Sequence, residues 1–204
     1  MILEVKNVSC TRSHRKLFSG IDFCLNAGEV VLIEGKNGSG KSTLLKVLSG
    51  LRRPDKGEVL WCGKSLPFNG VEYTKQIAWV SHHNGVKESM TAKENLKLFS
   101  ALSNVKSVDI DEVLCKIGLN GFGNRPVHQY SAGMKRRLSL SRLLLKEAKL
   151  WILDEPQASL DKEGVALFEK LAGDHLSQGG MIAMSSHHDV QLDKHRVLKL
   201  NLLQ

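Results

Sequence analysis

Residues 35–42 read GKNGSGKS, a glycine-rich stretch that closes on a lysine and a serine. The spacing matches G-x-x-x-x-G-K-[ST] without a mismatch, and the stretch lies between a strand-like apolar run and a helical pattern. Glycines permit positive φ angles, so successive N–H groups can curl around a phosphate. Lys41 would add charge at the β- and γ-phosphates of a nucleotide, and the Ser42 hydroxyl would ligate Mg²⁺. The predicted nucleotide contacts are Gly35, Lys36, Asn37, Gly38, Ser39, Gly40, Lys41, Ser42 and Thr43.

A pair of acids, Asp154 and Glu155, follows the apolar run LWIL. At the end of a buried strand, the Asp154 carboxylate can hold Mg²⁺ indirectly, from the ion's second coordination shell, and Glu155 can polarise an attacking water. Adjacent acids before a proline also occur as a helix N-cap, and the pair alone does not separate these readings. Together with the glycine-rich loop, it predicts a nucleotide triphosphatase.

A second anion site is predicted at YSAGM, residues 130–134, directly before a basic helix. The Ser–Ala–Gly start leaves backbone N–H groups free at the helix N-terminus, and such groups attract anions. Ser131 and Gly133 are the residues expected to contact this anion. Because residues 35–43 already form a complete phosphate site, the second site needs a different explanation.

The elements that must position these residues follow from the hydrophobic pattern. Residues 3–8 and 21–25 alternate like antiparallel strands, whereas the runs within 28–35, 149–156 and 179–186 are continuously apolar. Further short strands are expected at 57–63 and 76–81, and helices at 42–48 and 161–176. Buried strands that alternate with helices indicate a parallel α/β sheet, with the mainly helical residues 91–146 inserted between two strands.

Composition narrows the class of protein. With 42% hydrophobic and 25% charged residues among 204, the sequence is typical of a soluble globular protein, and no apolar run reaches the ~20 residues that span a bilayer. Four widely spaced cysteines predict reduced, mostly buried thiols in the cytosol. The net charge of +8 fits a basic solvated face or a surface near a membrane. We expect no nucleic-acid partner, because no nucleic-acid motif accompanies the charge.

In this order, the motifs resemble those of ATP-binding cassette (ABC) ATPases over nearly the whole chain. The resemblance implies an α/β P-loop NTPase fold with a mixed or parallel sheet core, an N-terminal antiparallel β subdomain and a helical insertion subdomain. It implies one ATP-binding domain, 1–204, with a core at about 1–90 and 147–204 and a helical part at 91–146. In this family, the counterpart of YSAGM binds the γ-phosphate held by a second subunit. Ser131 and Gly133 would therefore act in trans within a homodimer formed on ATP, although Ala132 replaces a glycine and Met134 a glutamine.

The same resemblance assigns further roles. Glu155 would be catalytic, Asp161 would lie in the D-loop, and His187 would be the switch histidine, with His188 as the alternative. His82 occupies the position of the Q-loop glutamine, where a histidine can hydrogen-bond Mg²⁺-bound water. The family usually stacks an aromatic ring on adenine. Arg12 aligns there, and its planar guanidinium could replace the ring; a solvated basic loop is the alternative.

Within the family, the sequence is most similar to the ATP-binding subunits of the cytochrome c maturation system. The carrying stretches include residues 17–63, 125–145, 149–168 and 178–184. This resemblance implies an ATP hydrolase on the cytoplasmic face of the inner membrane, bound to integral subunits of the CcmB and CcmC types. It would use ATP and Mg²⁺ to drive haem export or delivery, or release of a haem chaperone, with no direct haem site of its own.

Rival functions stay open. The nucleotide motifs do not identify cargo, so an exporter of drugs, lipids or peptides is the nearest alternative. A soluble ABC ATPase of translation or DNA repair is a second, but such proteins usually carry tandem cassettes or a coiled-coil insertion. A regulatory module without turnover is a third. The retention of four residues argues against it: Lys41, Asp154, Glu155 and His187.

Overall fold

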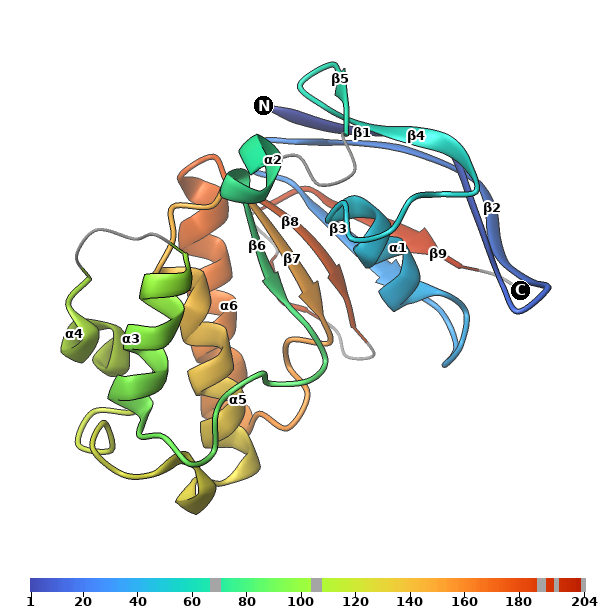
Figure 1. Ribbon diagram of the computed structural model, residues 1–204. Coiled ribbons are helices and arrows are strands. Elements are labelled where there is room, and N and C mark those ends of the chain that lie inside the picture. Colours follow the sequence, from blue (N-terminus) through green and yellow to red (C-terminus); the bar gives the residue numbers. More distant parts are fainter. Residues whose placement is uncertain (67–70, 104–107, 187–189, 193–194, 203–204) are drawn as a thin grey trace.

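The computed structural model describes residues 1–66, 71–103, 108–186, 190–192 and 195–202, which form two sheets and a helical part (Figure 1). One sheet is antiparallel, in the order β2-β1-β4-β5, and the other is parallel, in the order β6-β7-β8-β3-β9. The strands of the antiparallel sheet are β1 (Ile2–Arg12), β2 (Arg15–Asn26), β4 (Lys56–Trp61) and β5 (Lys64–Ser65). Those of the parallel sheet are β3 (Val30–Glu34), β6 (Ile77–Val80), β7 (Leu150–Asp154), β8 (Met181–Ser185) and β9 (Val197–Asn201).

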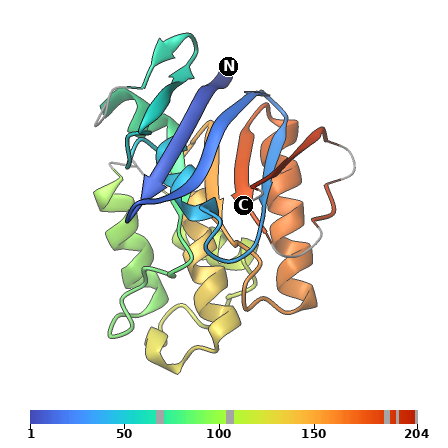
Figure 2. The same ribbon diagram turned by 90° about the vertical axis from the view of Figure 1, so that its right-hand side faces the viewer.

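Helix α1 (Lys41–Leu48) fills the space between the two sheets (Figures 1 and 2). Four of its residues are buried against both sheets: Leu44, Leu45, Val47 and Leu48. The other face of the parallel sheet is covered by α6 (Lys162–Ser177) and the short 3₁₀ helix η2 (Ser141–Leu144). The parallel strands are buried on both faces, which explains their continuously apolar sequence.

The stretch between β6 and β7 is helical, as the sequence predicts. It contains α3 (Ala92–Leu102), α4 (Ile110–Lys116), the short 3₁₀ helix η1 (Val127–Gln129), α5 (Ala132–Leu140) and η2. Helices α3, α4 and α5 share a core of their own, lying beside the sheets (Figure 1). The predicted α/β architecture with an N-terminal antiparallel sheet and a helical insertion is therefore confirmed. Helix α2 (Val71–Gln76), β5 and β9 were not predicted.

The structure shows where helix α6 begins relative to the acid pair 154–155. Asp161 is the N-cap of α6 and accepts a hydrogen bond from the Gly164 N–H at 2.8 Å. The acid pair 154–155 lies several residues earlier and is therefore not the N-cap of this helix.

All four cysteines carry free thiols; Cys10 is buried, and the other three are exposed. The expectation of reduced cysteines is confirmed, but the expectation that most of them are buried is wrong, because three lie at exposed positions.

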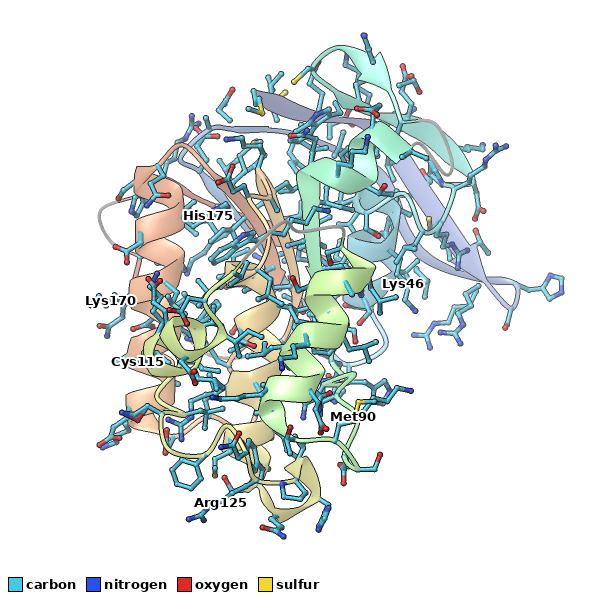
Figure 3. The ribbon with its side chains drawn as sticks, turned by 60° about the vertical axis from the view of Figure 1, so that its left-hand side comes forward. Lys46, Met90, Cys115, Arg125, Lys170 and His175 are labelled. Atoms are coloured by element: carbon cyan, nitrogen blue, oxygen red, sulfur yellow. The ribbon has the colours of Figure 1, made fainter. Side chains whose placement is uncertain are left out.

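Acid is expected to destabilise the fold through His175, near the end of α6 beside the parallel strands (Figure 3). Its ring stacks on Trp151, with the centroids 4.0 Å apart. Burial lowers the pKa of His175 to about 4, and the charge of Lys149 lowers it further, whereas the hydrogen bond between His175 Nε2 and the Met181 carbonyl oxygen, which accepts it, raises the pKa. The folded state thus binds this proton more weakly than the unfolded chain, and the stabilisation present above pH 6.5 is lost as the pH falls towards 4.

Urea unfolding at pH 7.5 and pH 5 measures this effect. Between pH 7.5 and pH 5 the free energy of unfolding should fall in both proteins, and the fall should be about 1 to 2 kcal/mol smaller in the His175→Gln variant than in the unmodified chain. His128→Gln, at an exposed site, is the matched control and should keep the full pH dependence. Equal pH dependence in the His175→Gln variant and the unmodified chain would exclude His175 as the source.

Candidate nucleotide-binding site

The loop at residues 35–40 connects β3 to α1 and depends on glycine at two positions. A Cβ on Gly35 would lie 2.6 Å from the Ser39 Oγ and 3.0 Å from the Leu202 carbonyl oxygen. A Cβ on Gly40 would lie 2.9 Å from the Phe18 ring, and Gly40 has a φ of 108°. Because side chains rarely adopt such φ values and lack space here, the tight loop can form only with glycine at these positions.

Lys41 is buried within this loop, with 6% of its surface exposed. Its ammonium group donates hydrogen bonds to the carbonyls of Gly35 at 2.7 Å and Lys36 at 3.3 Å. Beside it, the Ser39 hydroxyl is 1% exposed and finds no hydrogen-bond partner within the part of the chain that the structure describes. Buried polar groups are almost always satisfied, so this hydroxyl and the nearby charge suit a phosphate oxygen.

A cavity of about 440 Å³ opens next to the loop and brings distant residues together. Glu155 reaches it from the end of β7, and Ser42 and Thr43 reach it from α1. On the other side it is bounded by the β1–β2 hairpin. Its lining is Arg12, Ser13, Arg15, Leu17, Asn37, Gly38, Gly40, Lys41, Ser42, Thr43 and Glu155. The cavity thus joins the predicted phosphate loop, the predicted catalytic acid and the predicted adenine contact.

The two acids are fixed by a serine that sequence reasoning missed. Ser185, the last residue of β8, donates its hydroxyl hydrogen to Asp154 Oδ1 at 2.7 Å and accepts a hydrogen bond from the Glu155 N–H at 3.0 Å. Asp154 is 6% exposed. Glu155 adopts a φ of 49°, a left-handed conformation that a non-glycine residue rarely takes without support. The backbone therefore turns sharply where β7 ends, and the Glu155 side chain enters the cavity.

His82 lies beside the predicted catalytic acid. Its Nδ1 is 3.5 Å from Glu155 Oε2, and its side chain is exposed. The segment that carries it follows β6, which pairs with β7 in parallel, so the two strand ends lie next to each other. The structure thus brings together His82 and Glu155, which are far apart in the sequence. The predicted His187 and its alternative His188 lie outside the described residues.

The predicted second anion site has the geometry of a capped helix. Ser131 is the N-cap of α5 and accepts a hydrogen bond from the Met134 N–H at 3.2 Å. A Cβ on Gly133 would lie 3.1 Å from the Ser159 carbonyl oxygen, so α5 packs closely on the segment after β7. Ser131 is exposed, and neither it nor Gly133 belongs to the lining of the cavity. This placement suits a contact with a nucleotide on another chain.

The residues expected to hold Mg²⁺ supply suitable atoms. Ser42 presents a hydroxyl at the cavity. Asp154 uses its Oδ1 for the hydrogen bond from Ser185, and its Oδ2 is the second carboxylate oxygen. Hydroxyl and carboxylate oxygens are the ligands that Mg²⁺ prefers, and the remaining positions are usually filled by water and phosphate. The donor set therefore fits the ion.

The family model for ABC transporters matches residues 18–158, which include the loop, the capped helix and the acid pair. The chain belongs to the ABC transporter family. The chain, called the cassette from here on, is accordingly an ATP-binding protein with the ATP-hydrolysing activity of this family.

Full-length similarity extends to named relatives. The cassette is 40% identical over 202 residues to the cytochrome c biogenesis ATP-binding export protein CcmA of Aliivibrio fischeri, covering 98% of this chain and 99% of the relative. It is 42% identical over 203 residues to the protein of the same name from Escherichia coli O157:H7, covering 100% and 97%. Both comparisons confirm the resemblance inferred from the sequence.

Solved structures share the fold. A putative ABC transporter ATP-binding protein from Pyrococcus furiosus superposes with a TM-score of 0.85 at 25% identity, covering 99% of the cassette and 98% of that chain. The dimeric bacterial ABC transporter cassette MJ0796 gives a TM-score of 0.82 at 24% identity, covering 98% and 94%. The second likeness concerns the fold alone.

Removing the guanidinium of Arg12 is expected to weaken ATP binding about fivefold to tenfold, because a planar cation stacked on a base contributes about 1 kcal/mol. Arg12 lines the cavity at the start of the β1–β2 turn, and Arg15 lines it from the other strand of the hairpin. Titration of Arg12→Ala and Arg15→Ala with a fluorescent ATP analogue measures both contributions. Arg53→Ala, outside the cavity lining, is the control. An affinity unchanged in Arg12→Ala would leave the hairpin as a solvated basic loop.

Proposed function

We propose that the cassette is the ATP-hydrolysing subunit of a membrane ABC complex that drives haem export or delivery, or haem-chaperone release, during cytochrome c maturation. The observation that carries this proposal is the 40–42% identity to CcmA proteins across practically the whole of both chains. An exporter of another cargo would use the same nucleotide site. The full-length similarity favours the cytochrome c reading over that alternative and over a soluble, non-transporting ABC ATPase.

Integral membrane subunits of the CcmB and CcmC types are the proposed partners, reached from the cytoplasmic face of the membrane. None of the helices within the described residues has the length and apolarity to cross a bilayer. The proposed docking region is residues 83–100, where a fully buried Asn95 braces the loop before α3. Its side chain accepts from the Lys87 N–H at 2.7 Å and donates to the carbonyls of Lys87 and Thr91. This loop would present a preformed surface to a partner.

In the proposed catalytic cycle, two chains close head-to-tail on two ATP molecules. Residues 35–43 of one chain hold each triphosphate, and Ser131 with Gly133 of the other chain contact its γ-phosphate. Glu155 orients the attacking water, and His82 lies within reach of that carboxylate. When bound, Mg²⁺ held through Ser42 and Asp154 would neutralise charge on the phosphate oxygens. Phosphoryl transfer depends mainly on positioning and electrostatics, which a divided site supplies only when closed.

The proposal extends to the organisation of the chain and to the switch residue. We place residues 1–204 in one ATP-binding domain, with 91–146 as the part that carries Ser131 towards the partner chain. His187 would stabilise the charge that develops on the γ-phosphate. Closure of the dimer on ATP, followed by hydrolysis and reopening, would move the membrane subunits.

Deleting the gene in its host tests the cargo. Haem-stained gels should then show loss of c-type cytochromes, restored by the unmodified chain and not by the Glu155→Gln variant. Immunoblots for equal amounts of both chains are the control. Normal c-type cytochromes in the deletion strain would contradict the cytochrome c assignment while leaving the ATPase site in place.

A further inference from the structure

Arg136 is a fully buried cation that the sequence analysis did not single out. It lies on α5, five residues after Ser131, and is 2% exposed, which makes it one of the largest fully buried side chains among the described residues. Burial lowers the pKa of Arg136 to about 10, so the guanidinium stays charged at neutral pH. A buried charge is costly unless its donors are satisfied, and an arginine has five N–H groups in one plane.

Three of its hydrogen bonds reach the turn that carries the catalytic acid. Nη2 donates to the carbonyls of Asp154 at 3.0 Å and Glu155 at 2.6 Å, and Nε donates to the Pro156 carbonyl at 3.0 Å. Three successive carbonyls accept hydrogen bonds from one guanidinium, and the middle residue, Glu155, has the left-handed φ of 49°. The side chain thus supports the strained conformation that sends the Glu155 carboxylate into the cavity.

The same guanidinium holds the segment that carries His82. Nη1 donates to the Ser81 carbonyl at 2.9 Å, with longer contacts to the His82 carbonyl at 3.5 Å and Asn84 Oδ1 at 3.4 Å. One turn further along α5, Ser139 adds a hydrogen bond to the Asn84 carbonyl at 2.8 Å. One face of α5 therefore fixes the segment 81–84 relative to the turn at 154–156.

We propose that Arg136 is a positioning residue that holds Glu155 and His82 of its own chain in their hydrolytic arrangement and attaches both to the helix that carries Ser131. This inference rests on the proposed function, in which Ser131 contacts the nucleotide of the partner chain. A displacement of α5 caused by that contact would then pass directly to Glu155, because the guanidinium is rigid and contacts both segments. Each chain would sense its partner's nucleotide at its own catalytic acid.

Steady-state kinetics of the purified full chain give the first test. Arg136→Gln should lower kcat for ATP about 10²-fold, since misplacement of a catalytic group by about 1 Å has an effect of this size. The KM for ATP should stay within about twofold, because Arg136 does not line the cavity. Arg136→Lys, which keeps the charge and a shorter reach, should recover part of kcat. Arg137→Gln, at the next position of α5, should behave like the unmodified chain.

A buried arginine also stabilises the fold, and this must be separated from positioning. Leu176→Ala, in the core at the far end of α6, creates a cavity expected to cost about 2 to 5 kcal/mol. At a temperature where both variants are folded by circular dichroism, Leu176→Ala should keep its kcat. If it loses kcat as Arg136→Gln does, general destabilisation explains the loss and the proposal is wrong.

Mixing experiments decide which chain Arg136 serves. A Glu155→Gln chain supplies an intact Ser131 but no catalytic acid. Mixed before ATP is added, it should restore phosphate release with Ser131→Arg chains, because the mixed dimer contains one complete site. With Arg136→Gln chains it should restore nothing, since the only Glu155 in the mixture lies in the chain that lacks Arg136.

The outcomes distinguish the positioning role of Arg136 from the head-to-tail arrangement of the two chains. If Arg136→Gln is rescued as Ser131→Arg is, Arg136 acts through the partner's nucleotide and the positioning proposal is overturned. If Ser131→Arg is not rescued either, the head-to-tail divided site is wrong, and this proposal falls with it. Failure of rescue for Arg136→Gln alone, with the kcat loss described above, is the expected result.

Discussion

The Glu155→Gln variant is expected to lose ATP hydrolysis by at least about 10²- to 10³-fold and to keep its affinity for ATP. Glutamine preserves the size of the side chain but cannot accept a proton from the attacking water. The change leaves the backbone contacts of residue 155 to Ser185 and Arg136 intact, so the turn should keep its shape. Phosphate release measures hydrolysis, and equilibrium binding of a fluorescent ATP analogue measures affinity.

The same variant should remain dimeric in ATP, because a site that binds but does not hydrolyse keeps the two chains closed. Size-exclusion chromatography with and without ATP detects this state. Glu163→Gln, an exposed acid in the first turn of α6, is the control and should hydrolyse ATP at the normal rate. Hydrolysis within about threefold of normal in Glu155→Gln would show that another group orients the water.

Replacing Lys41 by alanine is expected to weaken ATP binding about 10²-fold, which corresponds to about 2.7 kcal/mol. Its ammonium group is held inside the loop by the carbonyls of Gly35 and Lys36, so the charge is already in place before a phosphate arrives. Charge-assisted hydrogen bonds to phosphate from a buried, pre-positioned cation are among the strongest in proteins. Isothermal titration with ATP measures the affinity.

Lys46 offers a matched control for this change. It lies on the same helix in an exposed position and is labelled in Figure 3. It does not belong to the cavity lining. Lys46→Ala should bind ATP with normal affinity. An equal loss in both variants would point to a general electrostatic attraction of the basic surface, and an unchanged affinity in Lys41→Ala would remove residues 35–43 from the nucleotide site.

Local sequence patterns were sufficient to predict the fold and the phosphate loop. The glycines of residues 35–42 have structural reasons, because Gly35 and Gly40 lack space for a Cβ and Gly38 has a positive φ of 82°. Continuous apolar runs identified β3, β7 and β8, which are buried on both faces. By contrast, β9 has an ordinary mixed sequence and joins the sheet only through its parallel pairing with β3. No local pattern could have revealed that pairing.

The groups that hold the predicted catalytic acid were missed for a similar reason. Ser185 and Arg136 contact Asp154 and Glu155 from 31 and 18 residues away along the chain. A serine at the end of a strand and an arginine in a basic helix have many ordinary roles, so neither gave a signal. His82 lies near Glu155 because β6 pairs with β7, and that pairing could not be predicted from the local sequence. The sequence suggested the position of His82 in the Q-loop, but not its neighbour.

The predicted adenine contact, Arg12, shows how far the sequence reached on this side of the cavity. Arg12 was placed by alignment, and the structure puts it on the cavity wall. Arg15 faces the same cavity because the β1–β2 turn contains only Ser13 and His14, which both have positive φ. The tight turn brings the two arginines to adjacent strands in register. The sequence showed a basic loop, but it did not show that both arginines line one wall of the cavity.

The most direct measurement is the capture of the tagged Glu155→Gln chain from solubilised native membranes in the presence of ATP, with identification of the bound proteins by mass spectrometry. We expect an integral membrane subunit of the cytochrome c maturation system, of the CcmB or CcmC type, in amounts comparable with the cassette. A permease for another cargo, or soluble proteins alone, would contradict it.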